Sequence, residues 1–316
     1  MPDSQNSQSC PSRSSCSTAG PDGSGCASCS AKNGADPFAA QDAAIATVLG
    51  QIRHTLFVMS GKGGVGKSSV TVNIAVSLAR KGYKVGIMDV DLHGPSVPNL
   101  LGLDCGLEMD DQERLIPAEY MENLHVISID SLLRNRDQAV LWRGPKKTAA
   151  IRQFISDVAW GDLDFLLIDS PPGTGDEHMT ILKTIPDALC VVVTTPQEIS
   201  LADVRKAINF LQYSQSRMLG VVENMSGLAC PHCGGHIPLF KKGGGEALAR
   251  KYAVPFLGAI PLDPLTVVAA DTGTPVALLE EDSAAKDGFS RVAETIASLV
   301  EKSGYVVMQR PAENEE

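Results

Sequence analysis

The sequence of 316 residues lacks the features that would suggest a membrane, nucleic-acid or secreted protein. It has no run of 18 apolar residues, so we expect no membrane-spanning helix. The formal net charge is −10, which disfavours binding to a phosphate backbone as the main activity. The first ten residues, MPDSQNSQSC, have neither a basic start nor an apolar core, so they are unlike a secretory signal. We therefore expect a cytoplasmic protein with no nucleic-acid partner and no membrane partner.

Cysteine, by contrast, is present eight times, and half of the cysteines lie near the N-terminus. Thiols stay reduced in the cytoplasm, so these cysteines suggest metal sites before disulfides. Residues 1–37 are rich in Ser, Gly and Pro, a composition typical of a flexible tail. The tail carries Cys10, Cys16, Cys26 and Cys29, enough thiols for one iron–sulfur cluster or one zinc ion. The alternative is a tail whose cysteines bind nothing.

The clearest motif is a glycine-rich stretch at residues 60–69, SGKGGVGKSS. It fits G-x-x-x-x-G-K-[ST] and lies between an apolar run and a helical pattern, the setting in which such a loop binds phosphate. Backbone N–H groups and the helix N-terminus would hold the phosphates of ATP. Lys67 would reach the β- and γ-phosphates, and Ser68 would ligate Mg²⁺. The expected nucleotide-binding residues of this loop are Gly61, Lys62, Gly63, Gly64, Val65, Gly66, Lys67, Ser68 and Ser69.

Polar residues at the ends of predicted strands complete the expected nucleotide site. Asp91 follows one strand and could hold the attacking water or belong to the Mg²⁺ ligand shell. Asp169 closes another strand in the manner of a Walker B aspartate, which orients Mg²⁺ through a water. The loop 170–176 that follows is rich in proline and glycine and has the position of a γ-phosphate-sensing switch. Asn224 follows a third strand, and its amide could read the adenine edge.

The order of predicted elements indicates the fold class. Helices are expected at 67–81, 146–160, 200–213, 264–271 and 285–302, and strands at 55–59, 85–88, 124–129, 165–168, 188–193, 219–222 and 256–260. This alternation predicts an α/β fold with a doubly wound, mainly parallel sheet of about seven strands and helices on both faces. We expect residues 38–303 to form this domain, with an irregular excursion at 102–123 and an acidic tail at 304–316.

A second cysteine pair lies in an insertion at residues 226–245. Cys230 and Cys233 have metal-ligand spacing, but a cluster or a closed zinc site usually needs four ligands. His232 or His236 could complete a zinc site within one chain. Alternatively, two chains could share one cluster across a two-fold axis. A pair of cysteines in a turn without metal is the third possibility.

Several motifs together resemble a known family. GKGGVGKS, with its early lysine, is similar to the deviant phosphate loop of the MinD, ParA, nitrogenase iron protein and Mrp families. The segments DVDLHGPSVPNLLG, LLIDSPPGTGDEHMT, TTPQEISLADVRKA, VVENMSGLACPHCGG and GAIPLDP extend the likeness from about residue 52 to residue 300. Over this region the chain resembles the Mrp family of iron–sulfur cluster carrier ATPases and the scaffold ATPases of cytosolic iron–sulfur assembly.

The resemblance implies a homodimer that binds MgATP and hydrolyses it slowly. In such families the early lysine, here Lys62, reaches across the dimer interface to the partner's nucleotide. Lys62 therefore joins Asp91 as an expected catalytic residue. The resemblance also implies a [4Fe–4S] cluster held between subunits by Cys230 and Cys233, for transfer to apo-proteins. The tail departs from the scaffold pattern, because no cysteine follows Cys29 until Cys105.

Two other functions fit parts of the sequence. A positioning ATPase of the MinD or ParA kind would use the same loop, although the acidic C-terminal segment and the C-x-x-C pair count against it. A zinc-binding regulatory ATPase would use the cysteines for zinc instead of a cluster.

Overall fold

The computed structural model describes residues 39–91, 94, 96–104, 106, 108–132, 144–229, 233, 235–237 and 239–310. The chain separates into residues 1–39, of which only Ala39 is described, and residues 40–316, which carry the fold. Five cysteines predicted to bind metal lie outside the described residues: Cys10, Cys16, Cys26, Cys29 and Cys230.

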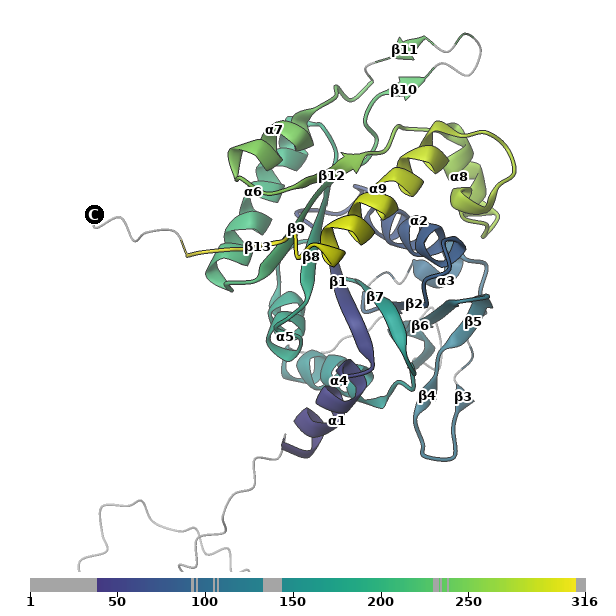
Figure 1. Ribbon diagram of the computed structural model, residues 1–316, viewed down its shortest axis with the longest axis vertical. Helices are drawn as coiled ribbons and strands as arrows, with labels where there is room; N and C mark the ends of the chain where they lie inside the picture. The colour runs from purple at the N-terminus through teal and green to yellow at the C-terminus, as the bar shows by residue number, and fades with distance from the viewer. Residues whose placement is uncertain are drawn as a thin grey trace, which may run out of the picture. The chain divides into compact units, whose positions relative to one another are not determined.

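A nine-stranded sheet lies at the centre of the described residues, in the order β12-β9-β8-β1-β7-β2-β6-β5, with β13 paired to β9 (Figure 1). The parallel strands are β1 (Ile52–Ser60), β2 (Val85–Asp89), β6 (Leu124–Ser128), β7 (Leu163–Asp169), β8 (Leu189–Thr194), β9 (Arg217–Glu223) and β12 (Phe256–Ala259). Two antiparallel strands, β5 (Ala118–Met121) and β13 (Val306–Val307), complete it. The predicted doubly wound, mainly parallel sheet is confirmed.

Helices cover both faces of the sheet (Figure 1). One face carries α2 (Lys67–Arg80), α3 (Val97–Leu100), α8 (Pro264–Asp271), η2 (Val276–Leu278) and α9 (Ala284–Glu301). The other carries α1 (Ala39–Leu49), α4 (Gly144–Asp157), α5 (Asp176–Thr184), α6 (Glu198–Tyr213) and α7 (Gly244–Lys251).

The central strand β1 shows why both faces are buried. Successive side chains of a strand point to opposite faces of the sheet. Leu56 and Val58 pack with α2 and α9, whereas Phe57 and Met59 pack with α4, α5 and α6. All of these side chains are almost completely buried, as expected for a parallel strand between two helical layers.

Some short strands were not expected from the sequence. The segment 102–123, predicted to be irregular, contains β5 and an antiparallel pair formed by β3 (Glu108–Met109) and β4 (Leu115–Ile116). A further pair, β10 (Leu228–Ala229) and β11 (His236–Ile237), lies in the cysteine insertion. Strands of two to four residues are too short to show a hydrophobic period.

The segment after α9 also joins the sheet. Val306 and Val307 of β13 pair with the beginning of β9, and Met308 is buried. Residues 304–310, the described part of the predicted acidic tail, therefore pack against the domain.

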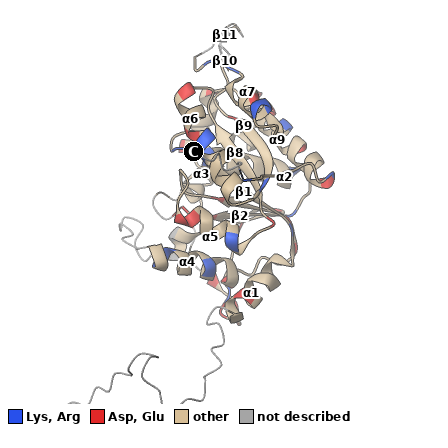
Figure 2. Ribbon diagram, turned by 90° about the vertical axis from the view of Figure 1, so that its left-hand side faces the viewer, with Lys and Arg blue, Asp and Glu red and all other residues tan. Residues whose placement is uncertain are grey.

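Charged residues of both signs are interspersed on the ribbon in Figure 2. Among the described residues, no helix combines the length and the apolar character that crossing a membrane requires. The apolar faces of the helices are instead directed to the two core layers beside the sheet.

Candidate functional site

The phosphate loop connects β1 to α2 at the carboxyl edge of the sheet. Gly64 and Gly66 have φ angles of 77° and 78°, a left-handed conformation that favours glycine. Gly66 immediately precedes α2, so the unpaired N–H groups of the first helical turn lie beside the loop. The loop lines a hollow of about 290 Å³ together with Asp91, Ser96, Leu100 and Pro172. This geometry can hold an anion such as a phosphate group.

Two glycines of the loop are in close contact with neighbouring elements. A Cβ atom on Gly61 would lie 2.4 Å from the backbone carbonyl carbon of Asp203 in α6. A Cβ atom on Gly66 would lie 2.4 Å from Nδ2 of Asn224, just after β9. The path of the loop is therefore fixed by α6 and by the end of β9, as well as by its own sequence.

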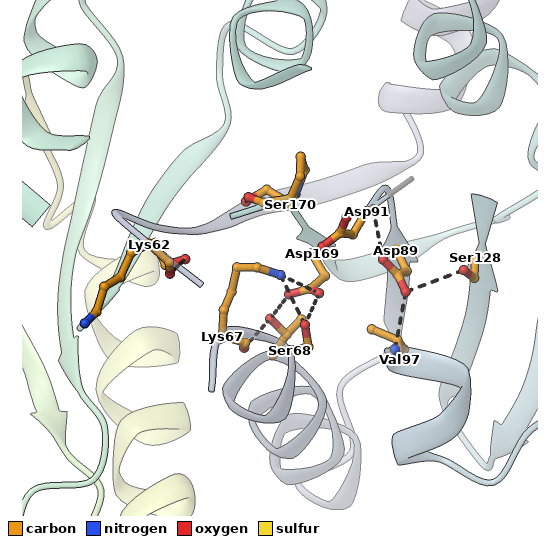
Figure 3. Close-up of polar contacts among 12 residues, drawn as sticks. Lys62, Lys67, Ser68, Asp89, Asp91, Val97, Ser128, Asp169 and Ser170 are labelled. Carbon is orange, nitrogen blue, oxygen red and sulfur yellow. Dashed lines mark hydrogen bonds and ion pairs between the residues drawn. The ribbon is translucent and has the colours of Figure 1, made fainter. Parts of the chain in front are cut away.

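The buried Lys67 and Asp169 and the half-buried Ser68 form a polar cluster at the start of α2 (Figure 3). Lys67 Nζ lies 2.6 Å from Asp169 Oδ2, and Ser68 Oγ donates to the same oxygen at 2.6 Å. Thr71 Oγ1 donates to Asp169 Oδ1 at 2.7 Å. Two of the three predicted magnesium residues, Ser68 and Asp169, thus lie together although they are 101 positions apart; the third, Asp91, lines the hollow. A hydroxyl and a carboxylate oxygen are ligands that suit Mg²⁺.

Asp89 is a site residue that sequence reasoning passed over in favour of Asp91. It ends β2 and pairs in register with Asp169 on β7. Asp89 is fully buried and accepts hydrogen bonds from the backbone N–H groups of Asp91 at 3.1 Å and Val97 at 3.3 Å. Burial and then the Asp169 charge raise the pKa of Asp89 to about 8, against the opposing effect of these hydrogen bonds and of Lys67. Asp89 therefore fixes the segment that places Asp91 in the hollow.

Lys62 lines the same hollow, but its side chain is directed away from the Lys67–Asp169 cluster (Figure 3). The side chains of Lys62 and Lys67 therefore point in different directions. A role for Lys62 at a partner's nucleotide agrees with this direction and stays a prediction.

Asn224 is buried and contacts the loop directly. Its Nδ2 donates to the carbonyl oxygen of Val65 at 2.9 Å. The structure therefore gives Asn224 a loop-holding contact that the sequence analysis did not foresee, and the reading of adenine by this amide stays a prediction.

The predicted switch loop, residues 170–176, is held at its middle and near its C-terminal end. At the middle, Gly173 donates its N–H to the carbonyl of Ser60 at 3.1 Å. Near the end, the N–H of Gly175 donates to Nδ1 of His178 in α5 at 3.3 Å. Burial lowers the pKa of His178 to about 4, so the imidazole is neutral at pH 7 and can accept this bond. Ser60 precedes the phosphate loop, so the two loops are joined at this point.

The described cysteines differ in their surroundings. Cys190 lies in β8 and is fully buried, and burial raises the pKa of its thiol, so it has the character of a small core residue. Cys233 is exposed and lies in the insertion between β9 and α7. The geometry of the C-x-x-C pair itself stays a prediction, because Cys230 is outside the described part of the chain.

Glu223 holds the base of this insertion, and no sequence signal singled it out. It is the last residue of β9 and is fully buried. Its Oε1 accepts from Ser226 Oγ at 2.5 Å and from the N–H of Gly243 at 2.9 Å, and its Oε2 accepts from the N–H of Gly245 at 2.6 Å. Ser226 lies before the cysteines and the two glycines lie after them, so one carboxylate joins both ends of the insertion.

Comparison with known proteins adds family information to this geometry. A family described as "ParA: NUBPL iron-transfer P-loop NTPase" matches residues 51–297. The iron-sulfur cluster carrier protein of Methanocaldococcus jannaschii is 44% identical over 281 residues, which cover 87% of this chain and 96% of that protein. The cytosolic Fe-S cluster assembly factor NUBP2 homolog of Culex quinquefasciatus is 50% identical over 231 residues, which cover 72% of this chain and 90% of that protein.

A solved structure agrees with these matches. A nucleotide-binding protein from Archaeoglobus fulgidus, in complex with ADP, aligns with a TM-score of 0.67 at 41% identity. The alignment covers 76% of this chain and 94% of that chain.

Proposed function

The chain belongs to the NUBPL iron-transfer P-loop NTPase family, and on that premise we propose that it binds and hydrolyses MgATP and carries a [4Fe–4S] cluster to apo-proteins in the cytoplasm. The family membership confirms the resemblance to iron–sulfur carrier ATPases that the motifs indicated. One relative is named an iron-sulfur cluster carrier and another a cytosolic Fe-S cluster assembly factor, which supports the cargo and the compartment.

The buried cluster of Lys67, Ser68 and Asp169 is the observation that carries the nucleotide part of the proposal. On binding of ATP, the Lys67 ammonium group would leave Asp169 and contact the phosphates. Ser68 and Asp169 would then hold Mg²⁺, Ser68 directly and Asp169 through a water. Held there, Mg²⁺ would neutralise charge on the phosphate oxygens.

Hydrolysis would use groups at the rim of the hollow. Asp91 would orient the attacking water, and its place in the hollow beside the loop supports this role. Lys62 would act on the nucleotide of a second subunit, which agrees with its direction away from the cluster of its own chain (Figure 3). The role of Lys62 requires a homodimer with the two phosphate loops facing each other.

The cargo would be held between subunits by Cys230 and Cys233 of each chain. The exposure of Cys233 supports this assignment, because a ligand of a shared and transferable cluster must reach a second chain and the solvent. We assign Cys10, Cys16, Cys26 and Cys29 to a second iron–sulfur site, of which Cys26 and Cys29 have ligand spacing.

The deciding experiment is anaerobic reconstitution with ferrous iron and sulfide, followed by analysis of iron, sulfide and zinc. Wild-type protein should retain iron and sulfide in equal amounts, and the Cys230→Ala/Cys233→Ala variant should lose the share held between subunits while still binding ATP. Cys190→Ala, which removes a buried thiol instead, is the matched control and should retain the full amount.

Two results would contradict the proposal. Zinc without sulfide in the wild-type protein would favour a zinc-binding regulatory ATPase. Full retention by the double variant would move the cargo to the N-terminal cysteines.

The nucleotide part of the proposal has its own test. Lys67→Ala should abolish nucleotide binding, and unchanged binding would contradict the role assigned to the cluster of Lys67, Ser68 and Asp169.

A further inference from the structure

Two neighbouring residues at the end of β9 contact two different parts of the proposed machinery. Asn224 holds the phosphate loop through Val65, and Glu223 holds the base of the cysteine insertion. Successive side chains of an extended chain point to opposite sides, which allows adjacent residues to serve separate partners.

The contact on the loop side is short and closely packed. The distance from Asn224 Nδ2 to the Val65 carbonyl oxygen is 2.9 Å, and a Cβ atom on Gly66 would have no room beside the same Nδ2 atom. The backbone N–H of Asn224 donates to the carbonyl of Thr194 at 2.8 Å, which fixes the residue to β8. Val65 lies two residues before Lys67, so movement of the loop around a phosphate must displace or strain the Asn224 contact.

The contact on the insertion side is a buried carboxylate with donors on both arms of the insertion. Ser226 lies on the arm that leads toward Cys233, and Gly243 and Gly245 lie on the arm that returns to α7. Both glycine N–H groups lie at the N-terminus of α7, where a negative charge is stabilised by the helix dipole. A Cβ atom on Gly245 would lie 3.0 Å from Cβ of Glu223, so helix and strand are in close contact here.

We propose that Glu223 is a positioning residue for the cysteine insertion and that the Glu223–Asn224 pair couples it to the phosphate loop. The proposal rests on the proposed function for the identity of the two ligands, a nucleotide and a metal cluster. When nucleotide fixes the loop, the Asn224 contact fixes the end of β9, and the Glu223 carboxylate then holds both arms of the insertion in one arrangement. Such coupling is reciprocal, so a loaded insertion must change nucleotide affinity by the same factor.

Amide hydrogen exchange tests this coupling without requiring a cluster. The probe is Mg²⁺ with a non-hydrolysable ATP analogue at saturating concentration, and the readout is exchange in peptides that cover residues 239–248. In wild-type protein we expect nucleotide to slow exchange of the Gly243 and Gly245 N–H groups by at least about fivefold, the lower end of ordinary allosteric coupling. In Glu223→Gln the slowing should fall below about twofold, because the side-chain amide cannot accept from all three donors.

Asp263→Asn is the matched control. Asp263 also accepts from a backbone N–H at a helix N-terminus, that of Leu265 in α8, and from a serine hydroxyl, that of Ser283. These partners lie outside the insertion, so the control should keep the wild-type ratio of exchange with and without nucleotide. A purely structural role of Glu223 would change both exchange rates together and leave their ratio unchanged.

The outcomes separate this proposal from the proposed function. Nucleotide binding without slowing in the wild-type protein, or a wild-type ratio in Glu223→Gln, would overturn the coupling while leaving the carrier function intact. Absence of iron and sulfide after reconstitution would instead refute the cargo and leave the exchange result standing. If Glu223→Gln does not fold, Ser226→Ala can be used, because it removes a single donor from the same carboxylate. In that variant nucleotide should slow exchange by less than in the wild type, but still measurably.

Discussion

Asp89 provides the sharpest test of the electrostatics of the site. Its carboxyl group is fully buried beside Asp169, and its pKa rises from an ordinary value of 3.8 to about 8. Folding therefore requires Asp89 to take up a proton over most of the range between these two values. Asp89→Asn has nearly the same shape and no titrating group, so it should remove this requirement.

The sign and size of the effect follow from proton linkage. Between pH 3.8 and about 8, the folded protein binds one proton more than the unfolded chain at this position, so stability falls as pH rises. The slope is about 1.4 kcal/mol for each pH unit. Between pH 5 and pH 7 Asp89 should therefore reduce the free energy of unfolding by about 2 to 3 kcal/mol. Asp89→Asn should gain stability relative to wild type by this amount over the same interval.

The assay is urea unfolding of both proteins at several pH values from 5 to 8.5, with the difference between the two curves as the readout. All other residues are the same in both proteins, so their contributions cancel in the difference. Asp187→Asn is the control for loss of a surface carboxylate, because Asp187 is exposed and pairs with Arg217, and it should change the free energy of unfolding by no more than about 1 kcal/mol. A flat difference curve for Asp89→Asn would refute the assignment of a proton to Asp89.

Three further predictions concern the two loops. Gly61→Ala should destabilise the protein by about 1 to 3 kcal/mol, because its Cβ would overlap backbone atoms of Asp203. Gly63→Ala, which meets only an ordinary contact, should change the melting temperature little, and equal effects would contradict the packing argument. Burial lowers the pKa of His178 to about 4, so the wild type should lose stability as pH falls from 6.5 toward 4. His178→Asn should remove this loss, which urea unfolding at pH 4.5 and 6.5 would measure. An unchanged pH dependence in the variant would count against the prediction. Lys62→Ala should bind ATP normally and hydrolyse it at least about tenfold more slowly. A group that acts across an interface on the transition state affects turnover more than binding. Normal turnover in this variant would contradict a catalytic role for Lys62.

The sequence predicted most of the fold because the parallel strands are continuous apolar runs. Such runs are typical of strands that are covered on both faces, and the helical periods between them are regular. Local pattern could not reveal β13, because Val306 and Val307 are held by pairing with β9 and not by their own period. It could not reveal the β3–β4 pair for the same reason.

The site residues that belong to a sequence motif were predicted, and the one whose place depends on strand register was missed. Lys67, Ser68 and Asp169 follow from residue type and spacing, and the structure brings them within hydrogen-bond distance. Asp89 depends on the alignment of β2 with β7, which places it opposite Asp169. Because an alternation of two aspartates does not say which one lies opposite Asp169, the sequence favoured Asp91.

Glu223 illustrates a second limit of sequence reasoning. Its donors lie 3, 20 and 22 positions further along the chain, and two of them are backbone N–H groups of glycines. Almost every residue has a backbone N–H group, so the sequence does not indicate which of these groups bind a side chain. A glutamate that accepts from them cannot be distinguished by sequence from any other glutamate at the end of a strand.

The contacts of the phosphate loop indicate that its conformation is not a property of the motif alone. Gly61 is fixed by α6, Val65 by Asn224, and Lys67 by Asp169 on β7. A phosphate that draws Lys67 away from Asp169 therefore acts on a loop that is still held at two other points. One of these points is adjacent to Glu223 and hence to the cysteine insertion. The hydrogen-bonded route from the loop to the insertion therefore runs through the end of β9, beside the packing of Leu201 in α6 against Gly244.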